Sequence, residues 1–302
     1  MTERAGAPPD ITPVLVTYNS AGILGWSLPP LADCPAVVVV DNRSADDTVA
    51  RVRELLPRAT LIEAGRNLGF GRANNLGLEA VSTPWALLHN PDARLEPGAL
   101  WALHEAAQRH PEAAIIAPAL WDQAGDAPPV IADFFRGPWH APAARPAPEP
   151  AGELCAEFVS GAAMLLNMAL MRRVGFFDPW FFLYFEDDEL CLRVRAAGLP
   201  ILVVPQARMR HRVRQSSTPS ARTTLRRIYC MTLSKLYLTR KVFGTGACVA
   251  LALRSGLASA LALPFMLLTL QRERAMRHAA RAGAALMAWR HLRRAHCFEP
   301  DA

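Results

Sequence analysis

Asp41, Asp92 and the Glu186–Asp187 pair each stand where an apolar run with the composition of a β-strand stops. The runs that they end cover residues 36–42, 84–92 and 181–189, and a fourth run, residues 11–19, ends in Thr17, Tyr18 and Asn19. In an open α/β sheet, ligands bind outside the carboxyl ends of the strands. Carboxylates at such positions face solvent and substrate, so the pattern predicts an enzyme whose site handles a metal ion and a polar substrate.

The spacing of these runs predicts an α/β fold. Strand-like segments at 36–41, 59–63 and 85–89 alternate with helix-like segments at 45–56, 65–81 and 97–109. Strands that alternate with helices in this way are typical of βαβ units and of a mostly parallel sheet flanked by helices. Ser44 is expected to cap the first of these helices. Later segments predict a strand to about Leu166, a helix ending at Gly175, a helix over 188–198 and a last strand over 200–205.

We expect the chain to have two parts, a catalytic domain over residues 1–240 and basic, apolar helices over 241–302. Within the first part, residues 122–152 are rich in Pro, Ala and Gly, which predicts a long surface loop or lid. Residues 201–302 contain 18 of the 33 Lys and Arg residues but only three acids, a net charge of +15, whereas residues 1–200 carry −9. A tail of this charge is expected to meet something anionic, either phospholipid or nucleic acid.

The apolar part of this tail has the length to cross a bilayer. Residues 242–270 contain a single charge, Arg254, but Arg254 and Pro264 interrupt the segment. An Arg-rich helix expected over 272–294 follows it. Amphipathic helices at the membrane interface explain this pattern better than a single span does, and both interpretations stay open at this point.

Composition and cysteine usage indicate the compartment. With 51% hydrophobic and 20% charged residues, the chain is neither disordered nor a polytopic membrane protein. No secretory signal opens it, because residues 1–10 are polar, and the six cysteines show no CxxC pairing or zinc spacing. We therefore expect a cytoplasmic protein with reduced thiols, held peripherally at the inner face of the cell membrane.

Six motifs occur in the order found in one enzyme family. They are VTYNS (16–20), VVVVDNRSADDT (37–48), NLGFGRANNLGL (67–78), LLHNPDA (87–93), FVSGAAMLL (158–166) and FFDPWFFLYFEDDELCLRVRAAG (176–198). Over residues 11–240 the chain resembles the family 2 inverting glycosyltransferases, in particular their rhamnosyltransferase-like bacterial branch. The resemblance implies a GT-A fold, a Rossmann-like domain with a metal-assisted site for a nucleotide-sugar donor. Arg43 and His89 depart from the family pattern, which commonly has Gly and Leu at these positions.

The resemblance assigns the donor nucleotide to the first half of the chain. Asp41 is expected to accept a hydrogen bond from the N3–H of a pyrimidine, which favours a UDP- or dTDP-sugar. The other residues expected at the donor are Thr17 and Tyr18 in the base pocket and Arg66, Asn67 and Asn74 beside the Gly-rich loop 65–71. The residues alone leave alternatives open, since Asp41 also suits a turn and Asn74 also suits a helix cap.

Asp92 and His211 are the candidate metal ligands. By the resemblance, Asp92 takes the place of the last Asp in the family's DxD motif, with Asn90 in the first position. Such a carboxylate can ligate Mg²⁺ or Mn²⁺ that bridges two phosphates, although the sequence NPD also suits a turn. Relatives often have a metal-binding His where His211 is expected, just after the last strand. His211 stands between arginines and could equally belong to a basic patch.

Asp187 is the candidate general base for the acceptor hydroxyl, and Glu186 is the second candidate catalytic residue. Mutual repulsion within the acidic run 186–189 is expected to raise the carboxylate pKa values, which suits proton abstraction near neutral pH. Trp180 and Glu189 are expected at the acceptor. The alternatives are that the aromatic residues pack in the core and that the acids simply begin a helix.

Together these residues predict an inverting, metal-assisted single displacement that moves a sugar, with rhamnose as one candidate, onto a glycan or lipid-linked acceptor. A nucleotidyltransferase is the first alternative, but residues 11–25 lack its usual Gly-rich loop with a basic residue. A nucleic-acid-binding protein is the second, but no motif that reads DNA or RNA appears, so we expect no nucleic acid partner. A degenerate sugar-binding scaffold is the third, which the intact Asp92 and Asp187 disfavour.

Overall fold

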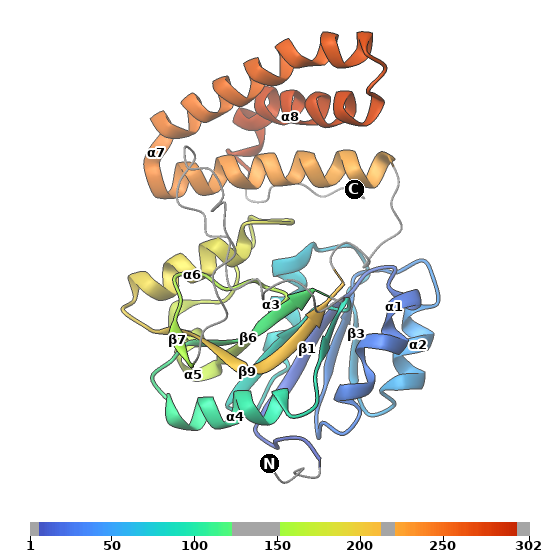
Figure 1. Ribbon diagram of the computed structural model, residues 1–302, viewed down its shortest axis with the longest axis vertical. Coiled ribbons are helices and arrows are strands. Elements are labelled where there is room, and N and C mark those ends of the chain that lie inside the picture. The colour runs from blue at the N-terminus through green and yellow to red at the C-terminus, as the bar shows by residue number, and fades with distance from the viewer. Residues whose placement is uncertain (1–5, 123–151, 213–220, 295–302) are drawn as a thin grey trace.

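The computed structural model describes residues 6–122, 152–212 and 221–294. In this part of the chain, nine strands form one sheet with helices on both faces. Two long C-terminal helices lie on the side toward which the arrowheads of the central strands point (Figure 1). Apart from its ends, the loop or lid predicted over 122–152 lies outside the described residues.

The sheet has a parallel half and a mixed half. Its order is β3-β2-β1-β4-β8-β6-β9-β5, and β7 pairs with β9. Strands β3, β2, β1 and β4 pair in parallel, as β6 and β9 do, whereas β8, β5 and β7 run antiparallel to their neighbours. The strands are β1 (Ile11–Thr17), β2 (Val38–Asp41), β3 (Thr60–Glu63), β4 (Trp85–His89), β5 (Ala93–Leu95), β6 (Ile115–Asp122), β7 (Leu154–Cys155), β8 (Ala163–Asn167) and β9 (Ile201–His211). This confirms the α/β fold, with a mixed second half of the sheet.

Two apolar cores cover the two faces of the central strands. Neighbouring residues of a strand point to opposite faces, so Leu15 and Val14 of β1 enter different cores. One core packs β1 and β4 against α1 (Ala21–Ser27), α2 (Thr48–Leu55) and α4 (Ala99–Arg109), with η1 (Pro29–Leu31) beside it. The other packs them against α3 (Phe70–Glu79), α5 (Met168–Val174) and α6 (Glu186–Ala196). Burial on both faces explains why these strands are continuous apolar runs.

Two sequence predictions about element ends are wrong. Helix α2 begins at Thr48, and Ser44 does not cap it, because the Ser44 hydroxyl donates to the Asp41 carboxylate at 2.6 Å. Strand β9 continues to His211 instead of ending near 205, so His211 closes the strand and does not follow it. Residues 206–209 alternate between exposed and buried, which is the period of a strand with one solvated face.

The C-terminal helices form a layer of their own. Helix α7 (Ala221–Leu268) is broken at Gly244, where φ is 84° and ψ is 175°. We call residues 221–243 the inner half of α7 and residues 245–268 its outer half. Helix α8 (Arg272–His291) packs against both halves, through the Tyr229 hydroxyl 3.1 Å from His291 Nε2 and through the close approach of Gly256 to Ala285. By length and composition, Thr223–Leu268 is one helix in the described part of the chain that could cross a membrane.

The inner half of α7 also packs on the catalytic part of the chain. Trp180 and Phe181 share a third apolar core with Leu233 and Leu236 of the inner half and with Ala284 of α8. The predicted boundary between residues 240 and 241 falls inside α7, close to the break at Gly244.

Candidate active site

Asp41 is a rigid, buried acceptor at the carboxyl end of β2. Thr17 stands opposite it in the β1–β2 register, and its hydroxyl donates to Asp41 Oδ1 at 3.1 Å. Ser44 donates twice, from its backbone N–H to Oδ2 at 2.8 Å and from its hydroxyl to Oδ1. Strand β1 lies between β2 and β4, which is the point in a doubly wound sheet where ligands enter. The structure therefore brings Thr17 and Asp41 together at the predicted place.

The loop that follows β1 is braced by short polar side chains. Asn19 has a positive φ of 50°, its backbone N–H donates to the Ser44 hydroxyl at 2.9 Å, and its side chain accepts from Ala45 N–H at 2.7 Å. Tyr18 is half-buried in this loop. The sequence prediction missed Asn19 and gave Ser44 a different role. The available signal was a set of short polar residues directly after two neighbouring strands.

The Gly-rich loop is fixed to β2 by Asn42, which the sequence prediction also missed. The Asn42 amide donates to Gly69 O at 2.9 Å and its oxygen accepts from Leu68 N–H at 2.9 Å. Asn67 accepts from Gly69 N–H at 2.9 Å, and Arg66 is exposed. Thus Asn67 and Arg66 lie beside the loop as predicted, although no contact with a donor is described.

Asn74 lies inside helix α3 and does not cap it. The helix begins directly after Gly69, and the buried Asn74 amide donates to the carbonyl of Phe70, one turn earlier, at 3.1 Å. The cap alternative is therefore wrong, and contact with a donor stays a prediction.

Asp92 and His211 come together from distant parts of the chain. The antiparallel pairing of β5 with β9 places Ala93 opposite His211, and His211 Nε2 lies 3.1 Å from Asp92 Oδ1. Arg212 N–H also donates to Asp92 O at 2.8 Å. A carboxylate and an imidazole are suitable ligands for a divalent cation. Within the described residues no group of three or more His, Cys, Asp or Glu is placed to hold a metal ion.

His89, just before this turn, is enclosed. Its ring nitrogens lack hydrogen-bond partners in the described part of the chain, and burial lowers its pKa to about 4. At neutral pH it is therefore an uncharged side chain in a buried position.

Two backbone hydrogen bonds connect the Asp92 turn with Asp187. Asn90 N–H donates to Ala162 O at 3.0 Å, and the adjacent Gly161 N–H donates to Asp187 Oδ2 at 3.0 Å. The start of α6 is thereby fixed beside the end of β4. Gly161 is a site residue that the sequence prediction missed, because its contribution is a backbone N–H.

Burial is the main reason that the pKa values of the two catalytic candidates, Glu186 and Asp187, are raised. It raises the pKa of Glu186 well above its usual value, with smaller contributions from Asp187 and Asp188. It also raises the pKa of Asp187, while hydrogen bonds from Gly161 and Asp188 act in the opposite direction. The predicted direction is confirmed, but the predicted cause, mutual repulsion, is secondary to burial. Glu186 is 4% exposed and its Oε2 lacks a partner among the described residues, whereas Asp187 is partly exposed.

The segment before these acids is held in an unusual conformation. Tyr184 and Phe185 have positive φ angles of 69° and 65°, each of which costs a non-glycine residue about 1–3 kcal/mol. The inner half of α7 holds the segment, since Ser234 Oγ donates to Leu183 O at 2.9 Å and Arg227 Nε donates to the Tyr184 hydroxyl at 2.8 Å. Helix α7 thus helps to fix where α6 and Asp187 begin.

Trp180 and Glu189, the two residues predicted at the acceptor, make internal contacts. Trp180 is 4% exposed and stacks on Tyr237, with ring centroids 3.8 Å apart. Glu189 is 2% exposed and forms ion pairs with Arg193 at 2.8 Å and Lys241 at 2.6 Å. Their contact with an acceptor stays a prediction, and the contacts described here join α6 to α7.

Replacing Lys241 by Met should weaken the contact of α7 with α6 and with the segment before it. Lys241 Nζ bridges Glu189 and Asp178, the latter at 2.8 Å. We expect the free energy of unfolding to fall by about 1 kcal/mol, a modest loss because Lys241 is partly solvent-screened and Glu189 keeps Arg193. Lys241→Arg, which keeps the charge, is the matched control. Equal urea midpoints for wild type and Lys241→Met would contradict the bridging role.

The effect should depend on pH. Burial opposes ionisation of Asp178, but hydrogen bonds from Lys241, Trp180 N–H and Tyr237 outweigh it and hold the Asp178 pKa below its usual value. A lowered pKa gives stability that is present above the unfolded-state pKa of about 3.9 and is lost as pH falls through the folded-state value. The difference between wild type and Lys241→Met should therefore shrink below about pH 4.

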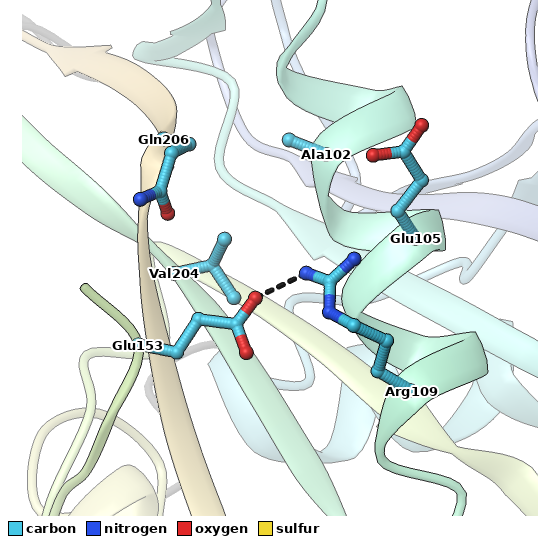
Figure 2. A pocket seen from close by; sticks show the side chains of 6 residues that line it. All are labelled: Ala102, Glu105, Arg109, Glu153, Val204 and Gln206. Carbon is cyan, nitrogen blue, oxygen red and sulfur yellow. Dashed lines mark hydrogen bonds and ion pairs between the residues drawn. The ribbon is translucent and has the colours of Figure 1, made fainter.

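A separate surface cavity of about 360 Å³ lies between α4 and β9 (Figure 2). An ion pair between Arg109 of α4 and Glu153 stands at its centre, and Glu105 and Gln206 also line it. None of the predicted site residues lines this cavity.

The comparisons with known proteins agree with the fold. A model of the family described as "Glycosyltransferase like family 2" matches residues 9–230. The chain is 30% identical over 234 residues to an N-acetylglucosaminyl-diphospho-decaprenol L-rhamnosyltransferase of Mycobacterium tuberculosis, covering 67% of this chain and 76% of the relative. It is 23% identical to the low-salt glycan biosynthesis hexosyltransferase Agl10 of Haloferax volcanii, covering 64% of each chain.

Solved structures of other transferases share the fold. The mannosyltransferase PcManGT from Pyrobaculum calidifontis, in complex with GDP-Man and Mn²⁺, superposes with a TM-score of 0.57 at 16% identity, covering 94% of this chain and 90% of that one. S. aureus TarS 1-349 in complex with UDP-GlcNAc gives 0.54 at 14% identity, covering 93% and 91%. The fold is therefore GT-A, and the match of the family model over most of the sequence shows that the chain is an enzyme of glycosyltransferase family 2.

Proposed function

We propose that this enzyme transfers a sugar, with rhamnose as the first candidate, from a pyrimidine nucleoside-diphosphate donor to a lipid-linked or other glycan acceptor, with inversion at the anomeric carbon. The observation that carries the proposal is the continuous path from the Asp92–His211 pair through Asn90, Ala162 and Gly161 to Asp187. The path connects the candidate metal ligands with the candidate base. In a single displacement, the base acts on one side of the anomeric carbon and the metal-bound diphosphate leaves from the other side.

Asp187 would take the proton from the acceptor hydroxyl. Its carboxylate is partly exposed and oriented by Gly161 N–H, and its raised pKa makes it a stronger base than an ordinary Asp. Glu186 is buried and its pKa is raised well above the usual value, which favours its uncharged form, so it is less suited to that step and would shape the floor of the site.

Asp92 and His211 would hold Mg²⁺ or Mn²⁺ at the donor diphosphate. Two protein ligands that leave the remaining positions to phosphate oxygens and water are a common arrangement for Mg²⁺, and the imidazole nitrogen favours a transition metal such as Mn²⁺. The bound cation would neutralise the charge that develops on the departing nucleoside diphosphate. The Mn²⁺ in the complex of the structurally similar mannosyltransferase is consistent with this assignment.

Asp41 would recognise the base. Its carboxylate is held by Thr17 and Ser44 in one orientation, and a fixed acceptor suits the N3–H of uracil or thymine. The similar M. tuberculosis rhamnosyltransferase supports rhamnose as the sugar and a diphospholipid-linked acceptor by its name alone. A cytoplasmic, peripheral position at the inner face of the membrane would bring the enzyme to such an acceptor.

Donor hydrolysis tests the proposal. Purified protein is incubated with UDP-, dTDP- and GDP-sugars in Mg²⁺, Mn²⁺ or EDTA, and nucleoside diphosphate release is measured. We expect slow, metal-dependent release from one pyrimidine donor, abolished by EDTA and by Asp92→Ala or His211→Ala. Asp33→Ala, at an exposed position, is the control. Absence of release together with absence of nucleotide binding by calorimetry in the presence of metal would refute the proposal.

A further inference from the structure

The outer half of α7 carries an apolar face with no protein partner in the described part of the chain. There, the large apolar side chains that are exposed all belong to α7, α8 and the turn between them. Leu253, Leu257, Leu261 and Phe265 are 58–70% exposed, and their spacing of four residues places them along one side of the helix. We call these four residues the outer stripe. Contiguous apolar surface of this kind on a soluble protein marks an interaction site.

The outer stripe points away from the rest of the molecule. The opposite side of the same helix is buried, through Cys248, Leu251 and Ser259, and Gly256 closely approaches Ala285 of α8. Figure 1 shows the order of the layers, with the inner half of α7 nearest the sheet, α8 next and the outer half farthest away. The stripe is therefore an outermost surface of the protein.

The same helices are strongly basic. Residues 221–294 contain 14 Lys and Arg and one acid, Glu273, which pairs with Arg277 at 4.0 Å. Lys235 of the inner half, Arg254 of the outer half and Arg281 of α8 come close enough to interact, since after burial the charges of Arg254 and Arg281 are what lower the pKa of Lys235. We call these three residues the basic trio. Like charges gathered from the two halves of α7 and from α8 are stabilised by an anion.

We propose that the outer half of α7 lies in the headgroup layer of an anionic phospholipid leaflet, with the outer stripe inserted among the acyl chains and the basic trio and the α8 arginines at the lipid phosphates. An apolar stripe bordered by cations is the pattern of a helix that lies in the interface. The biological role of this surface rests on the proposed function, because membrane binding would bring the transferase site to a lipid-linked acceptor. Binding to a lipid surface does not depend on the proposed function.

The packing of α8 indicates whether the outer half of α7 lies on the membrane or crosses it. The outer half is long enough to span, but α8 is packed along it: Gly256 closely approaches Ala285, and Cys248 and Leu251 share an apolar core with Ala284 and Ala288. A span would carry Arg272, Arg274, Arg277 and Arg281 of α8 to the depth of the hydrocarbon or strip α8 from its partner. Charged side chains are costly at that depth. Lying in the interface keeps both the packing and the hydration of these arginines.

This arrangement also orients the catalytic site. The inner half of α7 holds the segment before Asp187 through Ser234, Arg227 and Lys241, the last by its ion pair with Asp178. A leaflet bound to the outer half would therefore stand at a fixed position relative to Asp187. Figure 1 shows that the carboxyl ends of the central strands face the same side of the molecule as these helices.

Vesicle flotation of the full-length protein tests the surface. We expect binding to phosphatidylcholine vesicles with 30 mol% phosphatidylglycerol and weaker binding to pure phosphatidylcholine. Leu253→Ser/Leu257→Ser/Leu261→Ser should lower partitioning by on the order of 100-fold. Lys235→Gln/Arg254→Gln/Arg281→Gln should reduce the preference for the anionic lipid, because the other α8 arginines remain. Met231→Ser, also exposed but on the inner half, is the matched control and should bind as wild type. Unchanged binding by the stripe variant would overturn the proposal.

A C-terminal epitope tag distinguishes an outer half of α7 that lies in the interface from one that spans the bilayer. Protein bound to sealed vesicles from outside is treated with protease, with and without detergent. Cleavage of the tag without detergent is expected, and protection until detergent is added would show that the outer half crosses the bilayer. A dimer in sedimentation that the stripe variant loses, together with no vesicle binding, would assign the stripe to a second copy of the chain. Because no donor is used, failure here leaves donor hydrolysis intact, and failure of hydrolysis leaves vesicle binding intact.

Discussion

Replacement of Asp187 by Asn is expected to lower kcat/KM by on the order of 10²–10⁴-fold while the protein stays folded. The amide cannot accept the proton of the acceptor hydroxyl, but its oxygen can still accept the hydrogen bond from Gly161 N–H that holds the start of α6. The measurement is steady-state transfer to acceptor, with urea unfolding as the check on folding. A variant with more than a tenth of wild-type kcat/KM and an unchanged pH profile would exclude Asp187 as the base.

The pH dependence of the wild type should report the same group. As the proposed base, Asp187 would act in its ionised form, and burial raises its pKa, so activity should fall as pH drops through a value above the ordinary Asp pKa of about 3.9. For stability the sign is reversed. A folded-state pKa above the unfolded one means that the folded protein binds the proton more tightly, so stability falls as pH rises through that window. Asp187→Asn should remove this contribution.

Glu186→Gln, at the neighbouring residue, is the matched control for Asp187→Asn. Because Glu186 is buried, its pKa is raised well above the usual value, which favours the uncharged carboxylic acid over the carboxylate. An amide of nearly the same shape should therefore keep activity within about tenfold of wild type and keep or raise stability at alkaline pH. A loss as large as that of Asp187→Asn would assign the proton transfer to the pair instead of to Asp187 alone.

Gly69→Ala is expected to lower the free energy of unfolding by about 3 kcal/mol or more, the largest structural effect that we predict. Gly69 has a φ of +82°, and an added Cβ would lie 2.2 Å from the carbonyl oxygen of Phe182. That oxygen also accepts the Phe70 N–H hydrogen bond at 2.9 Å, so it cannot move without breaking the contact between the Gly-rich loop and the segment before Asp187. Urea unfolding and the KM for the donor should both change.

Gly65→Ala provides the control for the clash. Gly65 begins the same loop with a φ of +69°, but an added Cβ there meets nothing within 4 Å. It should cost only the backbone strain, about 1 kcal/mol. If the two variants were equally stable, the close approach of Gly69 to Phe182 would have no energetic importance.

The sequence allowed the local elements to be predicted because their signals are local. Strand β4 at 85–89 and helix α5 up to Gly175 match their predicted positions, since apolar period and a glycine stop are read from neighbouring residues. The end of β9 was missed because its last residues alternate arginine with buried Ala207 and Met209, which reads as a polar loop. Ser44 was assigned to a helix cap because a sequence cannot tell which of two nearby acceptors, the helix start or Asp41, a hydroxyl will reach.

The sequence by itself indicated part of the candidate site, since Asp41 ends β2 and Asp92 follows β4, and the carboxyl ends of these strands share one edge of the parallel half of the sheet. Glu186 and Asp187 do not follow a strand as predicted, because the segment before them is irregular and they begin α6. Only the tertiary structure decided which residues meet. The pairing of Asp92 with His211 depends on the β5–β9 register, and the support of Asp187 by Gly161 depends on β8 lying beside β4. Trp180 and Glu189 contact Tyr237 and Lys241 of α7. Burial is the main cause of the raised Asp187 pKa. The physical reason is that strand pairing, burial and helix docking are long-range, whereas the signals in a sequence report what lies within a few residues.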